Sequence, residues 1–383
     1  MNISSKIYVA GHKGLVGSAI TECLIRKGYN SLVFRTLNEL DLTDQDEVEK
    51  FFAKEQPEYV FLAAALVGGI MANNTFRADF IYQNLMIQSN IIHSSWKYKA
   101  KKLLFLGSTC IYPRDAPQPL KEEYLLTSPL EYTNEPYAIA KIAGLKMCES
   151  FNIQYKCNFI SVMPTNLYGP GDNYNLEKSH VLPALMRKIY LGKCLEYNNW
   201  QDIRKDLDRN PVENISGASD DKTILKILKK YGVYFTNDSL EIEDSHNSLK
   251  KGKIEVAVNV WGTGDPLREF MHSHDMAEAC VFVMEKADIN DIIGMNQSSR
   301  QPDYNAPHFL NIGTGEEITI KNLALKIKEL TGFKGNILFD KSKPDGTMRK
   351  ATDITQLRNL GFTHRYNLEE GLKMTLDAYL NRI

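Results

Sequence analysis

Glycines at positions 11, 14 and 17 lie between a short apolar run and a helical pattern, and this feature constrains the fold more than any other in the chain. The run Ile7 to Ala10 is typical of a strand, and Ser18 to Lys27 follows as a helix. Such glycines allow a tight turn in which backbone N–H groups and the positive helix end meet a pyrophosphate, although a plain glycine turn is the alternative. The loop predicted to bind a dinucleotide consists of Gly11, His12, Lys13, Gly14, Leu15, Val16 and Gly17.

Short β-rich runs alternate with helical stretches through the first third of the chain. Strands are predicted at Tyr59 to Ala64 and Lys102 to Leu106, with a helix at Tyr82 to Trp96 between them. A helix over Pro136 to Gln154 and a strand over Asn158 to Met163 extend the series. This order is typical of βαβ units, so the sequence predicts an α/β fold with a doubly wound parallel sheet.

The size and charge of the chain exclude several classes of protein. A length of 383 residues predicts two or three domains, and 43% apolar with 24% charged residues is the composition of a globular protein. The formal net charge of −1 provides no global positive field, so we expect no nucleic-acid partner and no binding to a membrane surface. The longest mainly apolar run, Tyr59 to Ala72, is too short to span a bilayer.

The cysteines indicate a reducing compartment. The chain has 6 cysteines without a CxxC pair or zinc spacing, and its start leads directly into Lys6 without an apolar secretion segment. We therefore expect reduced thiols and a cytoplasmic location.

His272-Ser-His274-Asp275 resembles a metal-binding pattern, but no Cys or Glu partner stands at ligand spacing, so no metal is expected.

The end of the second strand selects between the two nicotinamide cofactors. An acidic residue there would bind the ribose hydroxyl, whereas Arg35, with Lys13 in the glycine loop, offers cations for a 2′-phosphate. NADP(H) is therefore favoured over NAD(H), and a solvated arginine is the alternative. Asp41 and Leu42 are expected to hold the adenine edge or to cap the next helix.

Ser108, Tyr137 and Lys141 form the strongest catalytic pattern. Tyr137 and Lys141 are four residues apart, so they share one face of a helix. A cation one turn away stabilises a tyrosinate, which allows proton exchange with a substrate oxygen. Ser108 follows a strand, where its hydroxyl would bind that same oxygen.

With these residues in place, the sequence resembles the extended short-chain dehydrogenases/reductases, and within them the GDP-L-fucose synthase family. The stretches that carry the narrower resemblance are Val67 to Asn74, Asp79 to Asn84, Gly107 to Pro113, Asn134 to Gly144, Met163 to Pro170 and Lys343 to Thr347. The resemblance implies a Rossmann-type NADP-binding domain, mainly residues 1–178, and a smaller C-terminal α/β substrate domain, mainly residues 179–383, with some exchange of chain between them. It also implies a homodimer.

The resemblance assigns roles to residues that otherwise look bland. In isolation Cys110 is a small buried side chain and His180 begins a helix, but in this family the pair exchanges protons at C3 and C5 beside a C4 ketone. The resemblance adds Lys141, Pro164, Asn166, Leu167 and His180 to the cofactor-binding residues. The substrate-binding residues that it implies are Asn166, Arg187, Lys188, Trp261, Arg268 and Asp345, and a core aromatic is the alternative for Trp261.

The activity that follows is C3/C5 epimerisation of a GDP-4-keto-6-deoxy sugar and NADPH-dependent reduction at C4, giving GDP-L-fucose or a related GDP-6-deoxy sugar. One alternative is a C4-reductase alone, acting on a GDP-6-deoxy-4-keto-heptose for a surface polysaccharide. An NAD-type 4,6-dehydratase is disfavoured by Cys110. A cofactor-binding scaffold protein is disfavoured by the intact set of Ser108, Tyr137 and Lys141.

The chain departs from the family pattern in two places. Leu37 stands where a second basic residue is common, which weakens a 2′-phosphate clamp. Residues 190–255 form an insertion where the family has a short connector. The insertion contains an amphipathic helix over Lys222 to Lys230, and we expect it to pack over the nucleotide-sugar cleft or on a neighbouring subunit. A further polar stretch, Ile289 to Pro307, is predicted to be a surface loop.

Overall fold

The computed structural model describes residues 1–236, 255–296, 306–343 and 345–381. Contacts divide the chain into two units, each made of three segments. Unit 1 comprises Met1–Gly171, Glu269–Glu317 and Lys350–Leu368, and unit 2 comprises Asp172–Arg268, Ile318–Arg349 and Glu369–Ile383. The chain first passes between units after Gly171, shortly before the boundary predicted at residue 178. No described helix is both long and apolar enough to cross a membrane.

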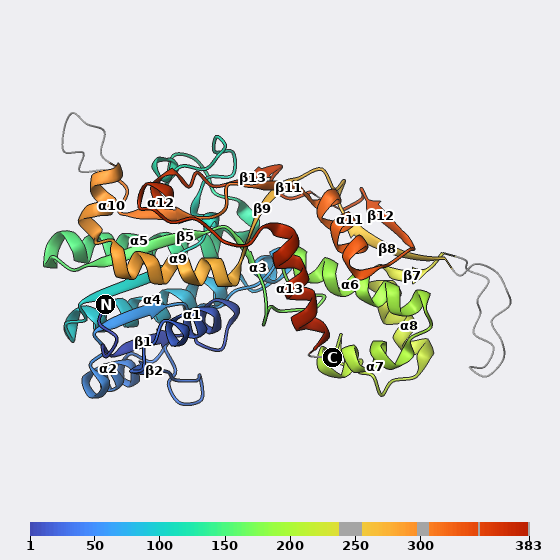
Figure 1. Ribbon diagram of the computed structural model, residues 1–383, viewed down its shortest axis with the longest axis horizontal. Helices are drawn as coiled ribbons and strands as arrows, with labels where there is room; N and C mark the ends of the chain where they lie inside the picture. The colour runs from blue at the N-terminus through green and yellow to red at the C-terminus, as the bar shows by residue number, and fades with distance from the viewer. Residues whose placement is uncertain (237–254, 297–305, 344, 382–383) are drawn as a thin grey trace. The chain divides into compact units, whose positions relative to one another are not determined.

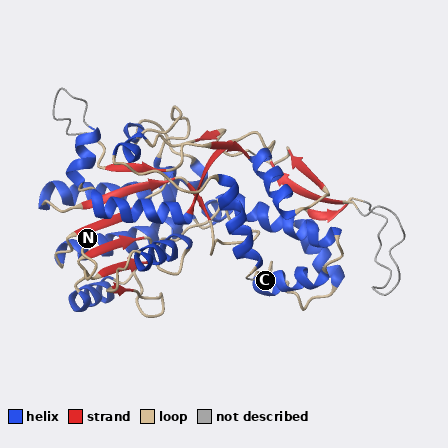
Figure 2. Ribbon diagram, viewed as in Figure 1, coloured by secondary structure: helices blue, strands red, loops and turns tan. Residues whose placement is uncertain are grey.

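Unit 1 is built on a six-stranded parallel sheet with the order β10-β5-β4-β3-β1-β2 (Figures 1 and 2). Its strands are β1 (Ile7–Ala10), β2 (Leu32–Val33), β3 (Tyr59–Leu62), β4 (Lys102–Leu106), β5 (Phe159–Pro164) and β10 (Phe309–Ile312). The chain forms β2 on one side of β1 and then crosses to β3 on the other side. The loops after β1 and β3 therefore diverge, which is where doubly wound sheets bind their ligands.

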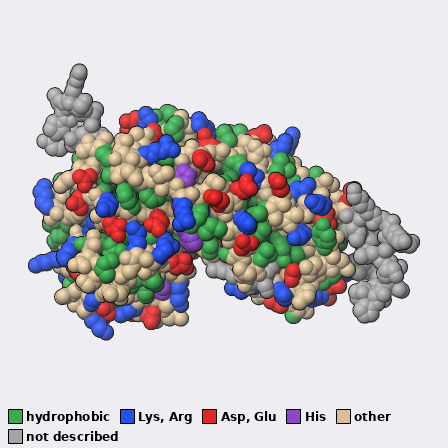
Figure 3. Space-filling view, in the orientation of Figure 1, with side chains coloured by type: hydrophobic (Ala, Val, Ile, Leu, Met, Phe, Trp, Pro, Cys, Tyr) green, Lys and Arg blue, Asp and Glu red, His purple; other side chains and the backbone are tan. Residues whose placement is uncertain are grey.

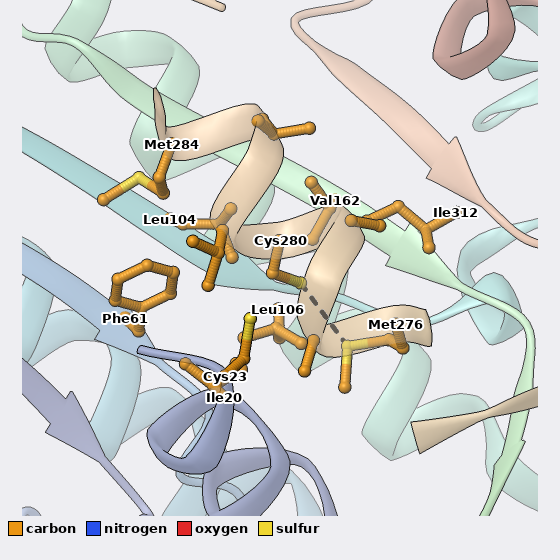
Figure 4. Close-up of a cluster of buried hydrophobic side chains, with 14 of the residues drawn as sticks. Ile20, Cys23, Phe61, Leu104, Leu106, Val162, Met276, Cys280, Met284 and Ile312 are labelled. Atoms are coloured by element: carbon orange, nitrogen blue, oxygen red, sulfur yellow. Dashed lines mark hydrogen bonds between the residues drawn. The ribbon is translucent and has the colours of Figure 1, made fainter. Parts of the chain in front are cut away.

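Helices cover both faces of this sheet because the strands are apolar on both sides. On one face lie α1 (Leu15–Arg26) and α9 (Ser273–Lys286), where Cys23, Met276 and Cys280 pack against the strands (Figure 4). The thiol of Cys280 lies 3.4 Å from the sulfur of Met276. The other face is covered by α2 (Gln45–Glu55), α4 (Arg77–Lys97) and α5 (Glu135–Tyr155). The predicted fold class is confirmed.

Shorter elements complete unit 1 and connect it to the rest of the chain. They are α3 (Ile70–Thr75), the 3₁₀ turns at Thr109–Ile111, Glu122–Tyr124 and Tyr132–Asn134, β6 (Asn166–Tyr168), β9 (Leu267–His272), α10 (Ile289–Asn296), β11 (Glu317–Thr319), β13 (Arg349–Lys350) and α12 (Thr355–Asn359). β6 pairs in parallel with β9, and β9 lies between β11 and β13 in a small sheet. The prediction of a loop over Ile289 to Pro307 is wrong for its first part, because α10 occupies it. Residues 297–305 lie outside the described residues.

Unit 2 contains a three-stranded sheet with the order β12-β8-β7 and the helices that pack near it. Its elements are α6 (Val181–Glu196), α7 (Trp200–Arg209), α8 (Asp221–Lys230), β7 (Val233–Phe235), β8 (Val256–Trp261), α11 (Ile320–Thr331), β12 (Asn336–Asp340) and α13 (Leu368–Leu380). The insertion supplies α7, α8 and β7, and β7 pairs antiparallel with β8. Ile224, Ile227 and Leu228 on α8 are buried, so the apolar face of this helix already has its partner within the chain.

The charged side chains are distributed without segregation by sign. On the visible face in Figure 3, acidic and basic side chains are interspersed over each unit. This distribution agrees with the formal net charge of −1.

Candidate active site

The glycine loop connects β1 to α1 through a turn that side chains would block. Gly11 has a φ of +83°, and a Cβ atom there would lie 2.7 Å from the backbone nitrogen of Ala64. A Cβ atom on Gly17 would lie 2.1 Å from the carbonyl oxygen of Gly11. Gly14 precedes α1 and provides no side-chain cap, which leaves the first N–H groups of the helix to a ligand. The loop is thus a cradle of backbone that fits a pyrophosphate.

His12 in this loop lies beside the end of β2. Its ring centroid is 5.0 Å from that of Phe34, and its buried Nδ1 has no hydrogen-bond partner among the described residues. Burial lowers the pKa of His12, and the charge of Lys13 lowers it further. A neutral ring with an unused nitrogen fits a ligand contact at this position.

Arg35 follows β2, as predicted for a 2′-phosphate contact, but its guanidinium already has partners. Its Nη2 lies 2.6 Å from Oε1 of Glu55, and its Nη1 donates to the carbonyl oxygen of Phe34 at 2.6 Å. Lys13 is exposed. A 2′-phosphate would therefore share Arg35 with Glu55, whereas Lys13 is accessible.

Asp41 does not cap the next helix, so that alternative is wrong. The cap of α2 is Asp44, whose carboxylate accepts the N–H of Glu47 at 2.9 Å. Asp41 instead accepts the backbone N–H and the hydroxyl of Thr43, both at 2.8 Å. The carbonyl oxygen of Leu42 accepts from Asn90 at 3.0 Å. Contact of Asp41 and Leu42 with an adenine stays a prediction.

The three reductase residues come from neighbouring parts of unit 1. Ser108 lies two residues after the end of β4, and Tyr137 and Lys141 lie one turn apart on α5. The Nζ of Lys141 donates to the carbonyl oxygen of Leu106 at 2.8 Å and lies 5.7 Å from the ring centroid of Tyr137. The turn after β4 and the first part of α5 thereby hold these side chains in one place.

Burial sets the protonation of this group. It raises the pKa of Tyr137, so the phenol carries its proton at neutral pH. It lowers the pKa of Lys141 to about 8, which still leaves the ammonium mainly charged near neutral pH. Reduction of a ketone requires a hydride donor and a proton donor, and this group offers the proton donor beside a cation.

Cys110 lies two residues beyond Ser108 and is only 7% exposed. Its backbone N–H donates to the Ser108 hydroxyl oxygen at 3.3 Å. Burial raises the pKa of the Cys110 thiol, whereas the charges of Lys350 and Lys141 and the hydrogen bond with Ser108 act to lower it. Sequence reasoning missed Lys350, which comes close to Cys110 only through the tertiary fold; its one local signal was the stretch ending at Thr347 just before it.

The segment after β5 contains the other residues predicted to bind the cofactor in unit 1. Pro164 ends β5, and Asn166 and Leu167 begin β6. The side-chain amide of Asn166 donates to the carbonyl oxygen of Glu269 at 2.8 Å. That bond fixes Asn166 at the end of the sheet that also holds the glycine loop, since both follow carboxyl ends of parallel strands.

In unit 2, Lys188 lies on α6 and His180 stands at the start of that helix. His180 precedes the first residue of the helix and is exposed. Lys188 is half-buried, and burial lowers its pKa to about 8. Within the described part of the chain its ammonium forms no hydrogen bond or ion pair. Lys188 thus offers a charge that a ligand phosphate would satisfy.

Arg187, next to Lys188, does not have the predicted role as a phosphate-side cation. It is 0% exposed, and its Nη2 lies 2.7 Å from Oδ2 of Asp206, which is also fully buried. Further bonds run to the carbonyl oxygens of Tyr174 and Asn210. Asp206 from the insertion already neutralises the buried charge of Arg187, so this guanidinium is not available to a substrate phosphate.

Three other residues of unit 2 were predicted to bind the substrate, and they differ in whether protein groups already occupy their side chains. Trp261 ends β8 and is 55% exposed, so the alternative of a core aromatic is wrong. Arg268 donates to the carbonyl oxygen of Leu267, and burial lowers its pKa while the charge of Asp345 opposes this. Asp345 accepts from the backbone N–H and hydroxyl of Thr263 at 2.9 and 2.8 Å. Asp345 therefore fixes the turn after Trp261. The Trp261 ring is exposed, and the Lys343 ammonium lies over it, 5.8 Å from the ring centroid.

The parallel sheet, the glycine cradle and the Ser108, Tyr137 and Lys141 group together define an extended short-chain dehydrogenase/reductase. Comparison with known sequences makes the assignment narrower. The chain belongs to the NAD dependent epimerase/dehydratase family, whose sequence profile matches residues 7–208 and 216–295, and within it to the GDP-L-fucose synthases.

The similarity extends over whole chains. The chain is 45% identical over 380 residues to GDP-L-fucose synthase 1 of Arabidopsis thaliana, covering 99% of this chain and 94% of the relative. A solved GDP-6-OMe-4-keto-L-xylo-heptose reductase from C. jejuni is 42% identical with a TM-score of 0.87, covering 100% and 99% of the two chains. A GDP-mannoheptose C4 reductase from Campylobacter jejuni with NADP bound is 41% identical with a TM-score of 0.80, covering 99% of each chain. The resemblance drawn from the sequence motifs is confirmed.

Proposed function

We propose that the protein is a bifunctional epimerase/reductase that converts a GDP-4-keto-6-deoxy sugar to GDP-L-fucose or a related GDP-6-deoxy sugar. The observation that carries the proposal is the position of Cys110. Its backbone N–H donates to the hydroxyl oxygen of Ser108 at 3.3 Å, and the charge of Lys141 acts on its thiol, so a group able to remove a carbon-bound proton stands among the reductase residues. Relatives named GDP-L-fucose synthase support the same activity.

The cofactor is NADP(H), in agreement with the related reductase solved with NADP bound. When bound, the cofactor supplies the hydride for C4. The backbone cradle around Gly11 and Gly17 would hold its pyrophosphate, and His12 and the accessible Lys13 lie beside that cradle.

In the reduction step, the protein handles the oxygen on C4. Tyr137 is protonated at neutral pH and donates its proton to that oxygen. The ammonium of Lys141 stabilises the phenolate that remains, and the hydroxyl of Ser108 orients the oxygen. Lys141 is buried, so little water screens its charge from the phenolate.

Epimerisation depends on the same ketone, because a C4 carbonyl acidifies the hydrogens on C3 and C5. Inversion of a carbon requires a base on one side and an acid on the other. We assign these roles to the Cys110 thiol and the His180 imidazole, whose ordinary pKa ranges suit such exchange.

Lys188, Trp261 and Arg268 are the unit 2 residues that we assign to the nucleotide sugar. Lys188 is a cation without a protein partner in the described residues, and Trp261 exposes its ring. A guanine base stacks on aromatic rings, and a diphosphate pairs with cations. Asp345 serves this region indirectly through the turn at Thr263.

The deciding experiment follows the reaction in D2O by proton NMR together with NADPH absorbance. The parent should incorporate deuterium at C3 and C5 and consume NADPH. Cys110→Ser should lose incorporation while keeping some direct reduction, whereas Tyr137→Phe should lose reduction and keep incorporation. Complete loss of both activities in each variant would contradict this division of roles.

A C4-reductase acting on a GDP-heptose is the second candidate. Two of the similar solved structures are heptose reductases, which is the observation in its favour. NADPH consumption with a GDP-4-keto-heptose, without deuterium at C3 or C5, would establish this function instead. Equal consumption with the hexose and full incorporation would exclude it.

We also propose a homodimer in the cytoplasm. The stretch from Phe80 to Trp96 on α4 contains no Asp, Glu, Lys or Arg, although part of it lies at the surface. Tyr82 on this helix is 63% exposed, and Ile139 on the adjacent α5 is 42% exposed. A second copy would cover this uncharged face. The six free cysteines support a reducing compartment.

A further inference from the structure

Glu269 is a fully buried carboxylate whose two oxygens accept four hydrogen bonds. It lies in β9 and is 0% exposed. Its Oε1 accepts the backbone N–H groups of Thr314 and Gly315 at 2.6 and 2.9 Å. Its Oε2 accepts the backbone N–H and the hydroxyl of Thr352, both at 2.7 Å. A buried carboxylate that accepts this many hydrogen bonds joins the segments that donate them.

The two joined segments are the loop after β10 and the segment after β13. They approach Glu269 closely, because a Cβ atom on Gly313 would lie 2.1 Å from its Oε1 and 2.3 Å from the hydroxyl of Thr352. Glu269 thus fixes the backbone two residues after Lys350, within unit 1.

The opposite side of the Lys350–Asp353 segment is also fixed. Gln118 accepts the N–H of Ala351 at 3.0 Å, and Leu120 exchanges backbone bonds with Ala351 and Asp353 at 2.7 and 2.8 Å. The buried amide of Asn311 donates to the carbonyl oxygens of Leu120 and Asp353.

The same Asn311 connects this segment to the turn that holds Cys110. The hydroxyl of Tyr112, two residues after Cys110, donates to Oδ1 of Asn311 at 2.6 Å. The Lys350–Asp353 segment and the turn that holds Cys110 are therefore joined by one hydrogen-bond network through Asn311. The charges that act on Cys110 are those of Lys350 and Lys141, and the charge of Cys110 in turn acts on Tyr137.

We propose that Glu269 is a positioning residue that holds the Lys350–Asp353 segment so that the Lys350 ammonium faces the Cys110 thiol. Glu269 acts through Thr352 and does not touch the substrate. The catalytic effect of this positioning rests on the proposed function. If Cys110 removes a carbon-bound proton, then Glu269 affects the rate of epimerisation, whereas the hydride step depends on Tyr137 and Lys141.

A carboxylate is needed at this position because all four of its partners are donors. Glutamine has the same shape, but its amide NH2 group is a donor. It would replace one carboxylate oxygen and face two hydrogen-bond donors that need an acceptor. Glu269→Gln would therefore release either Thr352 or the Thr314–Gly315 loop. Release of Thr352 moves Lys350 away from Cys110, and a thiol that loses a neighbouring cation becomes a weaker acid.

The test measures the rate at which iodoacetamide alkylates Cys110 in the full-length protein from neutral to alkaline pH. Mass spectrometry of the peptide that contains Cys110 separates it from the other cysteines. The midpoint is the pH at which the alkylation rate is half of its alkaline maximum. Lys350→Met sets the scale and should raise this midpoint by about one pH unit, which slows alkylation at neutral pH about tenfold. Glu269→Gln should raise the midpoint by roughly half a unit or more, about threefold in rate.

A matched pair of threonine variants provides the control. Thr352 and Thr375 are 2% and 0% exposed, and each hydroxyl donates one hydrogen bond at 2.7 Å. Thr352→Val should shift the midpoint in the same direction as Glu269→Gln, by less. Thr375→Val, on α13, should leave it unchanged. Should Glu269→Gln fail to fold, Thr352→Val still carries the test.

Two outcomes would overturn the inference. One is that folded Glu269→Gln and Thr352→Val both keep the parent midpoint, and the other is that Thr375→Val shifts it as much as Thr352→Val. Because the midpoint is measured without substrate, it does not depend on the proposed reaction. With substrate, Glu269→Gln should slow deuterium incorporation more than NADPH consumption; no activity with any keto sugar would refute the function while leaving the midpoint result intact.

Discussion

Adjacent positions on α6 show how little the residue type alone says about a role. Arg187 and Lys188 are both cations, yet one is 0% exposed and paired with Asp206, while the other has no partner in the described chain. The helix turns by about 100° per residue, so neighbours face different surroundings. The insertion supplies the acid that makes Arg187 structural.

This difference predicts opposite phenotypes for the two positions. Arg187→Met leaves Asp206 buried without its cation and should destabilise the fold by about 3–5 kcal/mol. Lys188→Met relieves a desolvated charge, so it should keep stability and weaken GDP binding about tenfold or more. Thermal unfolding and calorimetric titration with GDP measure the two effects. A large loss of stability in Lys188→Met, with unchanged GDP affinity, would reverse the assignment.

Lys188 also gives the site a pH dependence. Its pKa is lowered to about 8 by burial, so the free protein loses this charge as pH rises through that value. Affinity for GDP should therefore fall on the alkaline side of pH 8, because only the charged form attracts phosphate. Lys188→Arg should remove this fall, since a guanidinium stays charged. A parent and a variant with the same alkaline decline would assign it to another group.

At the level of elements, the fold requires a glycine at position 17 of the glycine loop but tolerates a side chain at position 14. Gly17→Ala places a Cβ atom 2.1 Å from the carbonyl oxygen of Gly11, and overpacking of this kind costs about 1–3 kcal/mol. A Cβ atom on Gly14 would lie at 3.6 Å, and its φ of −78° suits alanine. Gly17→Ala should lose NADPH binding and stability together, whereas Gly14→Ala should keep its unfolding temperature. Equal destabilisation by both would contradict this account; fluorescence titration and thermal unfolding provide the measurements.

The end of α9 depends on a lysine from a strand. Lys102 in β4 is buried, and its ammonium donates to the carbonyl oxygens of Val283, Met284 and Ala287 at the end of the helix. The Val283 oxygen also accepts the backbone N–H of Ala287. Burial lowers the pKa of Lys102, and the nearby Asp288 opposes this shift.

Lys102→Met should therefore unfold the last turn of α9 locally and cost about 1–3 kcal/mol. Hydrogen exchange should accelerate at the C-terminal turn of α9 and stay at the parent rate in α1. Uniform acceleration across both helices would show that the lysine supports the whole core rather than this helix end.

The limits of sequence-based prediction are visible in these same elements. β4 was predictable to the residue, because a buried parallel strand is a continuous apolar run bounded by turns. α7 and α10 were missed, since α7 is short and mainly polar, and α10 is a single short helix inside a polar stretch. Ser108, Tyr137 and Lys141 were predictable because their spacing is local. Lys350 and Glu269 were not, because only the fold brings distant segments together.

At the scale of the molecule, the outer faces of the helices on the two sides of the unit 1 sheet differ. α1 carries Arg26 and α9 carries Glu278, and these form an ion pair at the surface. α4 has an uncharged stretch over Phe80 to Trp96, which exposes Tyr82 to solvent in a single chain. A face without charges is expected to be covered in the assembled protein.

Two exposed isoleucines on opposite sides of that sheet allow a direct test of the assembly. Ile139 on α5 is 42% exposed, and Ile25 on α1 is 59% exposed. If the α4–α5 face joins two copies, Ile139→Asp buries an unpaired charge and weakens the dimer by at least about 3 kcal/mol, more than a hundredfold in dissociation constant. Light scattering should then give the mass of two chains for the parent and for Ile25→Asp, but one chain of 43.6 kDa for Ile139→Asp. A monomeric parent, or dimers in both variants, would exclude this face as the interface, and dissociation by Ile25→Asp alone would move the interface to the α1–α9 side.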